Sequence, residues 1–198
     1  MQRTPVAVLG TLAEFHREPI PYDLAALVRL VTELRPDLLC LDLTPEQWQR
    51  HDVGNLPPEY RDALLPLAHQ TDIVVVPIAG ERPPEEPQTT GWRRRASMLL
   101  RRWLAVLQGT APGPDAVNAG PRHFIADLLY EGIAALAGRA TQRAWRAHVE
   151  DLSNQVLEVA RRDPGCRVLV AVNVRYCHHL RRALGKCPEI RIVRYAHL

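Results

Sequence analysis

Lysine is nearly absent from this sequence, because all but one (Lys186) of its 25 basic residues are arginines. The arginine excess runs along the whole chain with many prolines, alanines and leucines, a bias typical of a GC-rich bacterial genome. The 22 acidic residues leave a net charge of +3, which is too small to indicate a protein dedicated to nucleic acid or to a membrane surface. Composition also excludes disordered, collagen-like and disulfide-scaffold proteins.

Long hydrophobic runs are missing as well. The longest apolar runs have the length of a strand, as in Ile73–Val76, and none approaches the roughly 20 residues of a membrane-spanning helix. The opening MQRTPVAVLG lacks the layout of a signal peptide and instead predicts a first strand. We therefore expect a cytoplasmic protein without a membrane segment.

Paired-cysteine motifs do not occur. The four cysteines have no C-x-x-C spacing, and a cytoplasmic chain of this size does not need disulfide bonds. Two of them stand in or beside strand-like runs, where a thiol behaves as a small hydrophobic side chain. We expect four reduced, buried and structural thiols: Cys40, Cys166, Cys177 and Cys187.

Two common catalytic motifs are absent. There is no G-x-S-x-G turn, and both Ser97 and Ser153 fall inside predicted helices, which argues against a serine nucleophile. After Gly10 the chain continues TLAEFHRE without a second glycine, which argues against a P-loop and a dinucleotide site.

Five short segments are apolar throughout instead of alternating with polar residues. Such runs are typical of strands covered on both faces, and the helical patterns between them favour right-handed crossovers. The sequence therefore predicts a single α/β domain over residues 1–198, with a mostly parallel sheet of about five strands. The predicted strands lie at residues 5–9, 37–43, 72–78, 167–172 and 189–195.

Helix signals separate these strands. Asp23 precedes an apolar stripe over Leu24–Leu34, and Thr44-Pro45-Glu46-Gln47 is a capping box with proline at the first helical position. Further helices are predicted near residues 58–69, 141–162 and 177–184, and a helical insertion at about 91–138.

The first helix of the insertion has an apolar stripe beside several arginines. We expect the stripe to face the core or a second copy of the chain, so that the middle helices form a homodimer. The stripe consists of Trp92, Ala96, Leu99, Trp103, Val106 and Leu107. The arginines at 93–95 and 101–102 could grip phosphates, but a solvated helix face explains them better, because no aromatic residues interleave them. Nucleic acid is therefore not an expected partner.

A ligand site in an open parallel sheet lies outside the carboxyl ends of the strands. Titratable and polar side chains follow four of the predicted strands at this edge. The candidates are Gly10, Thr11, Glu14, His16, Asp42, Glu81, Asn173, Arg175, Tyr176, His178 and His179.

These candidates support two chemistries. Imidazole and carboxylate ligands suit zinc or manganese, so His16, Asp42 and His178 form a possible metal set, with Glu14 as general base or a further ligand. Alternatively, the histidines are solvated loop residues and Asp42 begins a turn. The binding candidates are Gly10, Thr11, Asn173, Arg175 and Tyr176.

Two blocks of the sequence resemble the TraB/Tiki/erythromycin-esterase-like superfamily. The first is VLGT followed by a helix and ELRPDLLCLDL, and the second is ARRDPGCRVLVAVNVRYCHHLRRAL. The resemblance covers both ends of the chain, about half its length. It implies a metal-dependent hydrolytic site built from two Gly-x-x-His motifs and an acidic residue after the second strand.

The resemblance places the functional positions of the family on residues of this chain. Gly10 and Thr11 match the first motif, but its histidine falls on Ala13, and the acidic residue falls on Asp42. The second motif falls on residues 173–176, where both glycine and histidine are lost, and His178 coincides with a histidine of some relatives. Alanine can neither bind metal nor transfer a proton.

Two functional hypotheses follow. The first is a non-catalytic, pseudoenzyme-like binding or scaffolding protein without a cofactor, forming a homodimer. The alternative is a divergent zinc- or manganese-dependent hydrolase with its site at the carboxyl ends of the strands. The sequence identifies neither the substrate nor a protein or small-molecule ligand.

Overall fold

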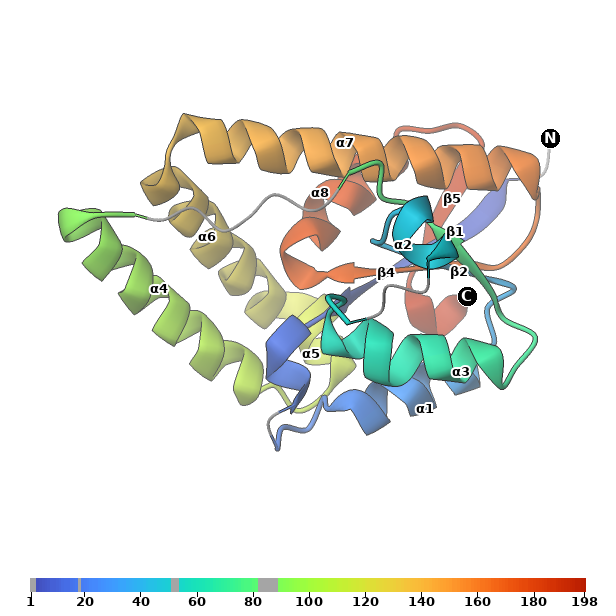
Figure 1. The fold of residues 1–198 in the computed structure, drawn as a ribbon, viewed down its shortest axis with the longest axis horizontal. Coiled ribbons are helices and arrows are strands. Elements are labelled where there is room, and N and C mark those ends of the chain that lie inside the picture. The colour runs from blue at the N-terminus through green and yellow to red at the C-terminus, as the bar shows by residue number, and fades with distance from the viewer. Residues whose placement is uncertain (1–2, 18, 51–53, 82–88) are drawn as a thin grey trace.

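The computed structural model describes residues 3–17, 19–50, 54–81 and 89–198, and it contains a five-stranded sheet in which every pairing is parallel (Figure 1). The strand order is β3-β2-β4-β1-β5. This arrangement confirms the predicted α/β fold. The strands are β1 (Thr4–Thr11), β2 (Leu38–Leu41), β3 (Val74–Pro77), β4 (Val168–Asn173) and β5 (Ile190–Val193).

Helices α1 (Leu24–Leu34) and α2 (Pro45–Gln49) begin where the capping signals predict. The Asp23 carboxylate accepts a hydrogen bond from the Ala26 N–H at 2.7 Å, and Thr44 and Gln47 form the reciprocal bonds of a capping box. The helical elements are η1 (Ala13–Arg17), α1 (Leu24–Leu34), α2 (Pro45–Gln49), η2 (Tyr60–Leu64), α3 (Leu65–His69), α4 (Gly91–Gly109), α5 (Pro114–Asn118), α6 (Gly120–Ala137), α7 (Arg139–Arg162), α8 (Val174–Leu184) and η3 (Tyr195–His197).

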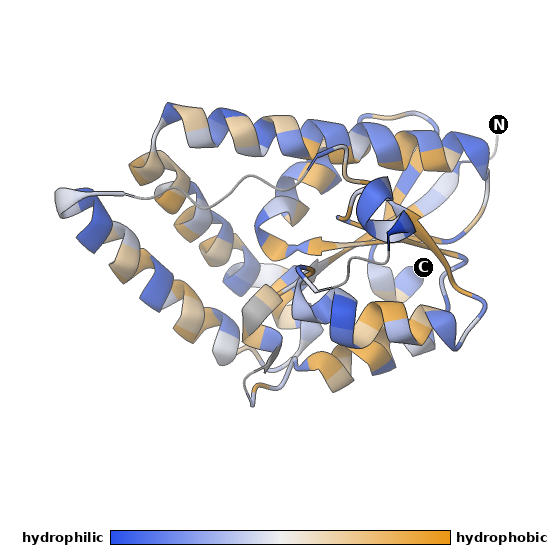
Figure 2. Cartoon of the chain, viewed as in Figure 1, coloured by the Kyte–Doolittle hydropathy of each residue, from blue (hydrophilic) through white to orange (hydrophobic). Residues whose placement is uncertain are grey.

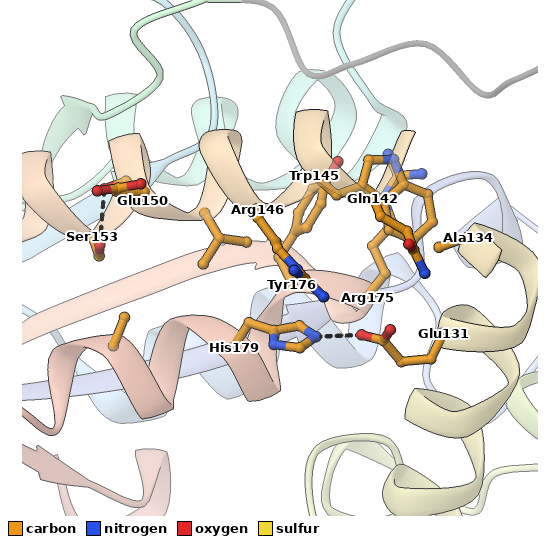
Figure 3. Close-up of a pocket in the computed structure, with 12 residues that line it drawn as sticks. Glu131, Ala134, Gln142, Trp145, Arg146, Glu150, Ser153, Arg175, Tyr176 and His179 are labelled. Atoms are coloured by element: carbon orange, nitrogen blue, oxygen red, sulfur yellow. Dashed lines mark hydrogen bonds and ion pairs between the residues drawn. The ribbon is translucent and has the colours of Figure 1, made fainter. Parts of the chain in front are cut away.

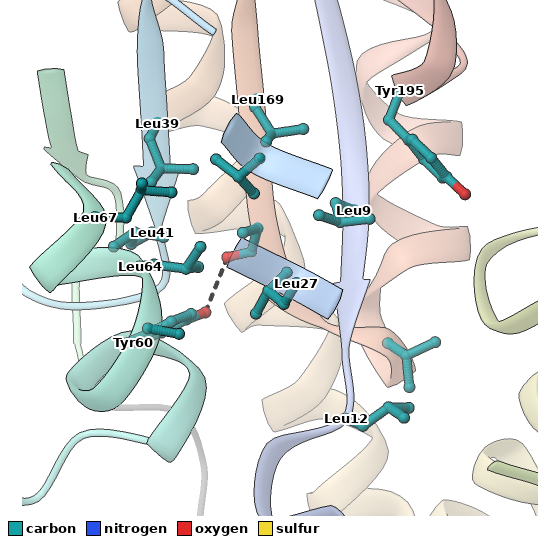
Figure 4. Packing of buried hydrophobic residues seen from close by; sticks show 14 of the residues in the cluster. Leu9, Leu12, Leu27, Leu39, Leu41, Tyr60, Leu64, Leu67, Leu169 and Tyr195 are labelled. Atoms are coloured by element: carbon teal, nitrogen blue, oxygen red, sulfur yellow. Dashed lines mark hydrogen bonds between the residues drawn. The ribbon is translucent and has the colours of Figure 1, made fainter. Parts of the chain in front are cut away.

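Both faces of the sheet are covered, as the continuous apolar strands require. Alternate residues of each strand point to opposite layers, and the strands are hydrophobic along most of their length (Figure 2). Leu9, Leu41 and Leu169 pack in the layer of α1 and α3 (Figure 4), whereas Val8 and Val170 pack in the layer of α7 and α8.

The order of the strands decides where a ligand site can lie. The connections β1→β2 and β2→β3 run through α1 and α3 on one face, and the connections β3→β4 and β4→β5 run through α7 and α8 on the other. Strand β4 lies between β1 and β2, so the chain leaves neighbouring strands toward opposite faces. Such switch points open a crevice at the carboxyl edge of a sheet.

Of the two alternatives for the apolar stripe of the middle helices, the one that places it against the core is wrong. Helix α4 packs on α6 through a small cluster that includes Leu104, Ala126 and Ile133. Most of the stripe points to solvent instead, with Trp92 69% and Trp103 61% exposed, whereas Leu107 packs on the cluster with α6. The reason is that α4 has two apolar stripes, and the one that contains Leu104 contacts α6.

The four cysteines are free, as predicted, and burial raises the pKa of the Cys40 and Cys177 thiols to about 12. Cys166 and Cys187 are only half-buried. Among the described residues, no helix is long and apolar enough to cross a membrane.

Gly10 lies where β1, α5 and α8 meet, and we predict that this position tolerates no side chain. A Cβ there would lie 3.0 Å from Asn118, Val174 and Cys177. Gly10→Ala should lower the free energy of unfolding in urea by about 1–3 kcal/mol, because the neighbours must shift. The control is Gly54→Ala, whose Cβ would meet nothing within 4 Å and should change stability little. Equal stability of the two variants would contradict the prediction.

Candidate functional site

A cavity of about 270 Å³ lies at the carboxyl edge of the sheet, and we call it the sheet-edge cavity. Residues that follow three neighbouring strands reach it: Ala13 after β1, Asp42 after β2, and Asn173 at the end of β4. The segment from 55 to 60 and the first turn of α8 complete the wall. The lining residues are Ala13, Asp42, Gln47, Asn55, Leu56, Pro57, Glu59, Tyr60, Asn173, Arg175 and Tyr176.

Asp42 forms one half of a buried acid–imidazole pair. Its Oδ2 lies 3.0 Å from Nε2 of His148 on α7, and both side chains are 5% exposed. The His148 ring in turn packs on the Tyr176 ring with centroids 5.0 Å apart. The other oxygen, Asp42 Oδ1, is buried and has no hydrogen-bond partner among the described residues.

Glu59 is a second carboxyl group buried at this cavity. Its Oε1 accepts a hydrogen bond from the Thr11 hydroxyl at 2.8 Å, whereas Oε2 has no partner with hydrogen-bond geometry in the described parts of the chain. Burial raises the pKa of Glu59, and the backbone N–H groups of Glu59 and Ala13, which lie nearby without forming a hydrogen bond of good geometry, offset part of that rise together with the Thr11 hydroxyl. Leaving a buried oxygen without a hydrogen bond costs free energy. The unpartnered oxygens of Asp42 and Glu59 therefore favour a ligand that donates hydrogen bonds.

The first turn of α8 supplies the basic and aromatic wall. Asn173 caps the helix, because its side chain accepts the Arg175 N–H at 3.1 Å. The Arg175 guanidinium lies 4.8 Å from the Tyr176 ring centroid and 5.3 Å from that of Trp145. A further cavity of about 420 Å³ shares Ala13, Asn173 and Arg175 with the sheet-edge cavity. The sheet edge thus gathers the predicted candidates Asp42, Asn173, Arg175 and Tyr176, with Thr11 behind Glu59.

His16 does not reach this site with a free nitrogen. Its Nε2 accepts the Leu12 N–H at 2.8 Å, and its Nδ1 lies 2.8 Å from the Tyr22 carbonyl oxygen, to which it donates. The ring is 2% exposed, and burial lowers its pKa to about 4. Both ring nitrogens hold the loop after β1, so His16 is a neutral structural residue in place of the expected ligand.

The predicted metal set does not assemble. His178 is exposed on α8, with Nδ1 3.7 Å from Asp127 on α6, whereas Asp42 is bound to His148. No group of three or more His, Cys, Asp or Glu side chains suited to a metal occurs within the described residues. Helix α8 starts at Val174, three residues before the predicted start, and this places His178 on its outer face.

The remaining candidates have other roles, or their side chains are not among those that the structure describes. The Gly10 N–H donates to the Asn118 side chain, which makes Gly10 part of the packing between β1 and α5. Glu81 is exposed beside the undescribed segment 82–88. His179 pairs with Glu131 at 2.7 Å. Glu14 belongs to η1, but its side chain is not among the described ones.

The sequence analysis missed Glu59 and His148. A signal for His148 was available, because it lies three residues after Trp145 and four before Leu152, on the apolar side of α7. A histidine on a buried helix face needs a polar partner, and Asp42 is that partner. No comparable signal marks Glu59 in the segment PPEYRDALL.

A comparison of the chain with known protein families, curated proteins and solved structures finds no significant match. The function is therefore inferred from the geometry of the sheet-edge cavity.

His16 makes acid stability a measurable property of this loop. Its folded pKa of about 4 lies below the ordinary 6.5, so the unfolded chain binds more protons between these values. We predict that the His16 contribution, up to about 3 kcal/mol, is present above pH 6.5 and is lost as pH falls toward 4. Urea titrations between pH 4 and 7 should show a shallower pH slope for His16→Gln than for the wild type. The exposed control, His197→Gln, should keep the wild-type slope; an unchanged slope in His16→Gln would refute the assignment.

Proposed function

We propose that this protein is a non-catalytic binding protein that holds a small polar ligand in the sheet-edge cavity. The observation that carries the proposal is the pair of buried carboxylate oxygens, Asp42 Oδ1 and Glu59 Oε2, that lack partners among the described residues and belong to residues lining one cavity. A folded protein gains nothing in stability from such atoms, because they lose water without gaining a hydrogen bond. A ligand that donates N–H or O–H bonds restores both.

The chemistry of the wall narrows the ligand class. Two carboxyl groups, the amides of Asn55 and Asn173 and one guanidinium surround a space the size of a small metabolite. Polyols and primary amines present the donors that Asp42 and Glu59 accept, and the amides provide further polar contacts. We therefore favour a polyhydroxylated or amino-bearing small molecule.

Binding without catalysis fits the residues at the positions that the resemblance makes important. Ala13, where the TraB/Tiki-like superfamily carries a histidine, lines the cavity and supplies no titratable group. His16, the nearest substitute in sequence, uses both ring nitrogens on the backbone. We regard the chain as a divergent, pseudoenzyme-like relative of that superfamily.

The alternative, a divergent zinc- or manganese-dependent hydrolase, has less support. Its proposed ligands His16, Asp42 and His178 bond to three different partners, and Asp42 is the one among them that lines the sheet-edge cavity. In the same proposal we assign the protein to the bacterial cytoplasm, because its four thiols are free.

Glu59→Gln provides the direct test of the binding function. A neutral amide keeps an acceptor for Thr11 but removes a buried charge, so the variant without ligand should unfold at a higher temperature than the wild type. The raised pKa of Glu59 fixes the sign of the pH dependence. The contribution of Glu59 to the free energy of unfolding is fully present below pH 4.5 and is lost as the pH rises through the pKa of the folded state. The stability advantage of Glu59→Gln over the wild type should therefore grow with pH.

The ligand arm of the same test uses thermal shift with a panel of polyols and primary amines, and matched carboxylates as controls. A donor-bearing class should raise the melting temperature of the wild type and lose this effect in Glu59→Gln. Purified protein should also contain far less than one zinc or manganese per chain. About one tightly held metal ion per chain, released by Asp42→Asn, would instead establish the hydrolase alternative.

We also propose that the protein is a homodimer, formed through an apolar surface that we call the α4/α6 face. Of the large apolar side chains that are exposed in the described residues, only Val74 lies elsewhere. The face combines Trp, Met and Phe, and α4 carries no Lys, Asp or Glu, a composition typical of interface centres. It consists of Trp92, Met98, Leu99, Trp103, Val106, Phe124, Ile125 and Leu128.

The size of the α4/α6 face fits a dimer of ordinary dimensions. Its side chains are 46–69% exposed. Covering the three aromatic side chains alone removes on the order of 400 Å² from each subunit, because an aromatic side chain buries about 150–250 Å² when it is fully covered. This area is about half of the roughly 800 Å² per partner of a standard interface, and the five aliphatic side chains of the face add to it.

Sedimentation equilibrium tests the dimer. The wild type should form a dimer, and Trp103→Ser with Leu128→Ser should weaken it at least about thirty-fold, because interface tryptophans contribute about 2 kcal/mol or more. Val74→Ser removes an exposed apolar side chain from the edge strand and should leave the dimer intact. A wild type that stays monomeric, or a dimer that both variants preserve, would reject this interface.

A further inference from the structure

A separate cavity of about 280 Å³ lies between α6, α7 and α8 (Figure 3), and we call it the interhelical cavity. It shares Arg175 and Tyr176 with the sheet-edge cavity, but most of its wall comes from helices and none from a strand. Its lining residues are Glu131, Ala134, Gln142, Trp145, Arg146, Val149, Glu150, Ser153, Arg175, Tyr176, His179 and Ala183.

The inner wall of the interhelical cavity is apolar and aromatic. Ala134 and Val149 are buried there, and the Trp145 and Tyr176 rings meet edge to face with centroids 6.3 Å apart. A flat apolar group placed against such a wall gains contact area together with favourable ring geometry. The wall therefore favours a ligand with a ring or a short apolar body.

Two hydrogen-bond donors belong to the lining of this cavity, one of them buried. Trp145 Nε1 is buried and has no hydrogen-bond partner among the described residues. Arg146, the next residue, is exposed and extends its guanidinium toward α8 (Figure 3). The buried indole N–H and the guanidinium of the following residue, both on the lining of this cavity, fit a ligand with a charged acceptor, because hydrogen bonds to charged groups are the stronger ones.

The two acidic residues of the lining leave room for an anion. Glu131 is paired with His179 at 2.7 Å. Glu150 lies with Ser153 at the opposite end of the cavity from Trp145 and Gln142 (Figure 3). The Arg175 guanidinium, which stacks on the Trp145 ring, adds positive charge to the end where the unpartnered indole N–H lies.

We propose that the interhelical cavity binds a small aromatic carboxylate. The ring packs against Trp145 and Tyr176, and the carboxylate accepts from the Trp145 N–H and the Arg146 guanidinium. This inference does not depend on the function of the sheet-edge cavity, where unpartnered carboxylates select a donor of the opposite kind.

The test uses benzoate as the probe, with benzylamine and benzyl alcohol as ligands of similar size but different charge. Isothermal titration should show that the wild-type chain binds benzoate at least tenfold more tightly than either control. Arg146→Gln should weaken benzoate binding at least tenfold, and Arg146→Lys should retain part of the affinity because it keeps the charge. Arg143→Gln is the matched control, because Arg143 is also exposed on α7 but does not line the cavity.

Trp145→Phe gives a second readout. It keeps the ring and removes the N–H, so it should reduce benzoate affinity while circular dichroism shows an unchanged fold. Equal binding of benzoate and benzylamine, or full benzoate affinity in Arg146→Gln, would overturn the proposal. Glu59→Gln should bind benzoate like the wild type, so this result stands apart from the test of the sheet-edge cavity.

Discussion

The position of β4 between β1 and β2 is the constraint on which the rest of the structure depends. All residues of β4 from Val168 to Val172 are fully buried, and parallel ladders join the strand to both neighbours. This strand enters the sheet after the long helical excursion of α4 to α7, so β1, β2 and β4 end side by side while their outgoing chains leave to opposite faces. The space between those exits contains Ala13, Asp42 and Asn173. The sheet-edge cavity is therefore a consequence of strand order, and its chemistry comes from the residues that happen to follow each strand.

Most of the fold could be predicted from local patterns, because continuous apolar strands and capping residues depend on nearby sequence. The sidedness of α4 could not. Its Trp92 stripe and its Leu104 stripe are both apolar, and periodicity does not say which of them a neighbouring helix will cover. Site residues that lie at the end of a strand, such as Asp42 and Asn173, could be predicted from the sequence. The partners of those residues come from far away in the sequence, as the Asp42–His148 contact across 106 residues shows, and no local signal fixes such a pair.

The histidines of the predicted metal set show why residue type alone does not identify a metal ligand. A histidine near a strand end has the right chemistry for zinc, but its function depends on where its two nitrogens point. In His16 both nitrogens bond to backbone groups within six residues, which stabilises the tight loop after β1. His148, which the sequence analysis passed over, is the imidazole that contacts a carboxylate of the sheet-edge cavity. Burial and partner identity therefore separate the structural histidine from the one that contacts the site.

Arg175 and Tyr176 line both cavities, so any difference in ligand preference between the two must come from the other lining residues. One guanidinium stacks on the rings of both Trp145 and Tyr176, so it contributes positive charge to each space while the rings limit its movement. On the sheet side, Asp42 and Glu59 line the same space, and their unpartnered oxygens favour a hydrogen-bond donor. On the helical side, the buried Trp145 N–H and the Arg146 guanidinium add to the positive charge of Arg175, and that space favours an anion. A single arginine can thus border two sites of opposite preference, because the preference of each is set by the groups on its far wall.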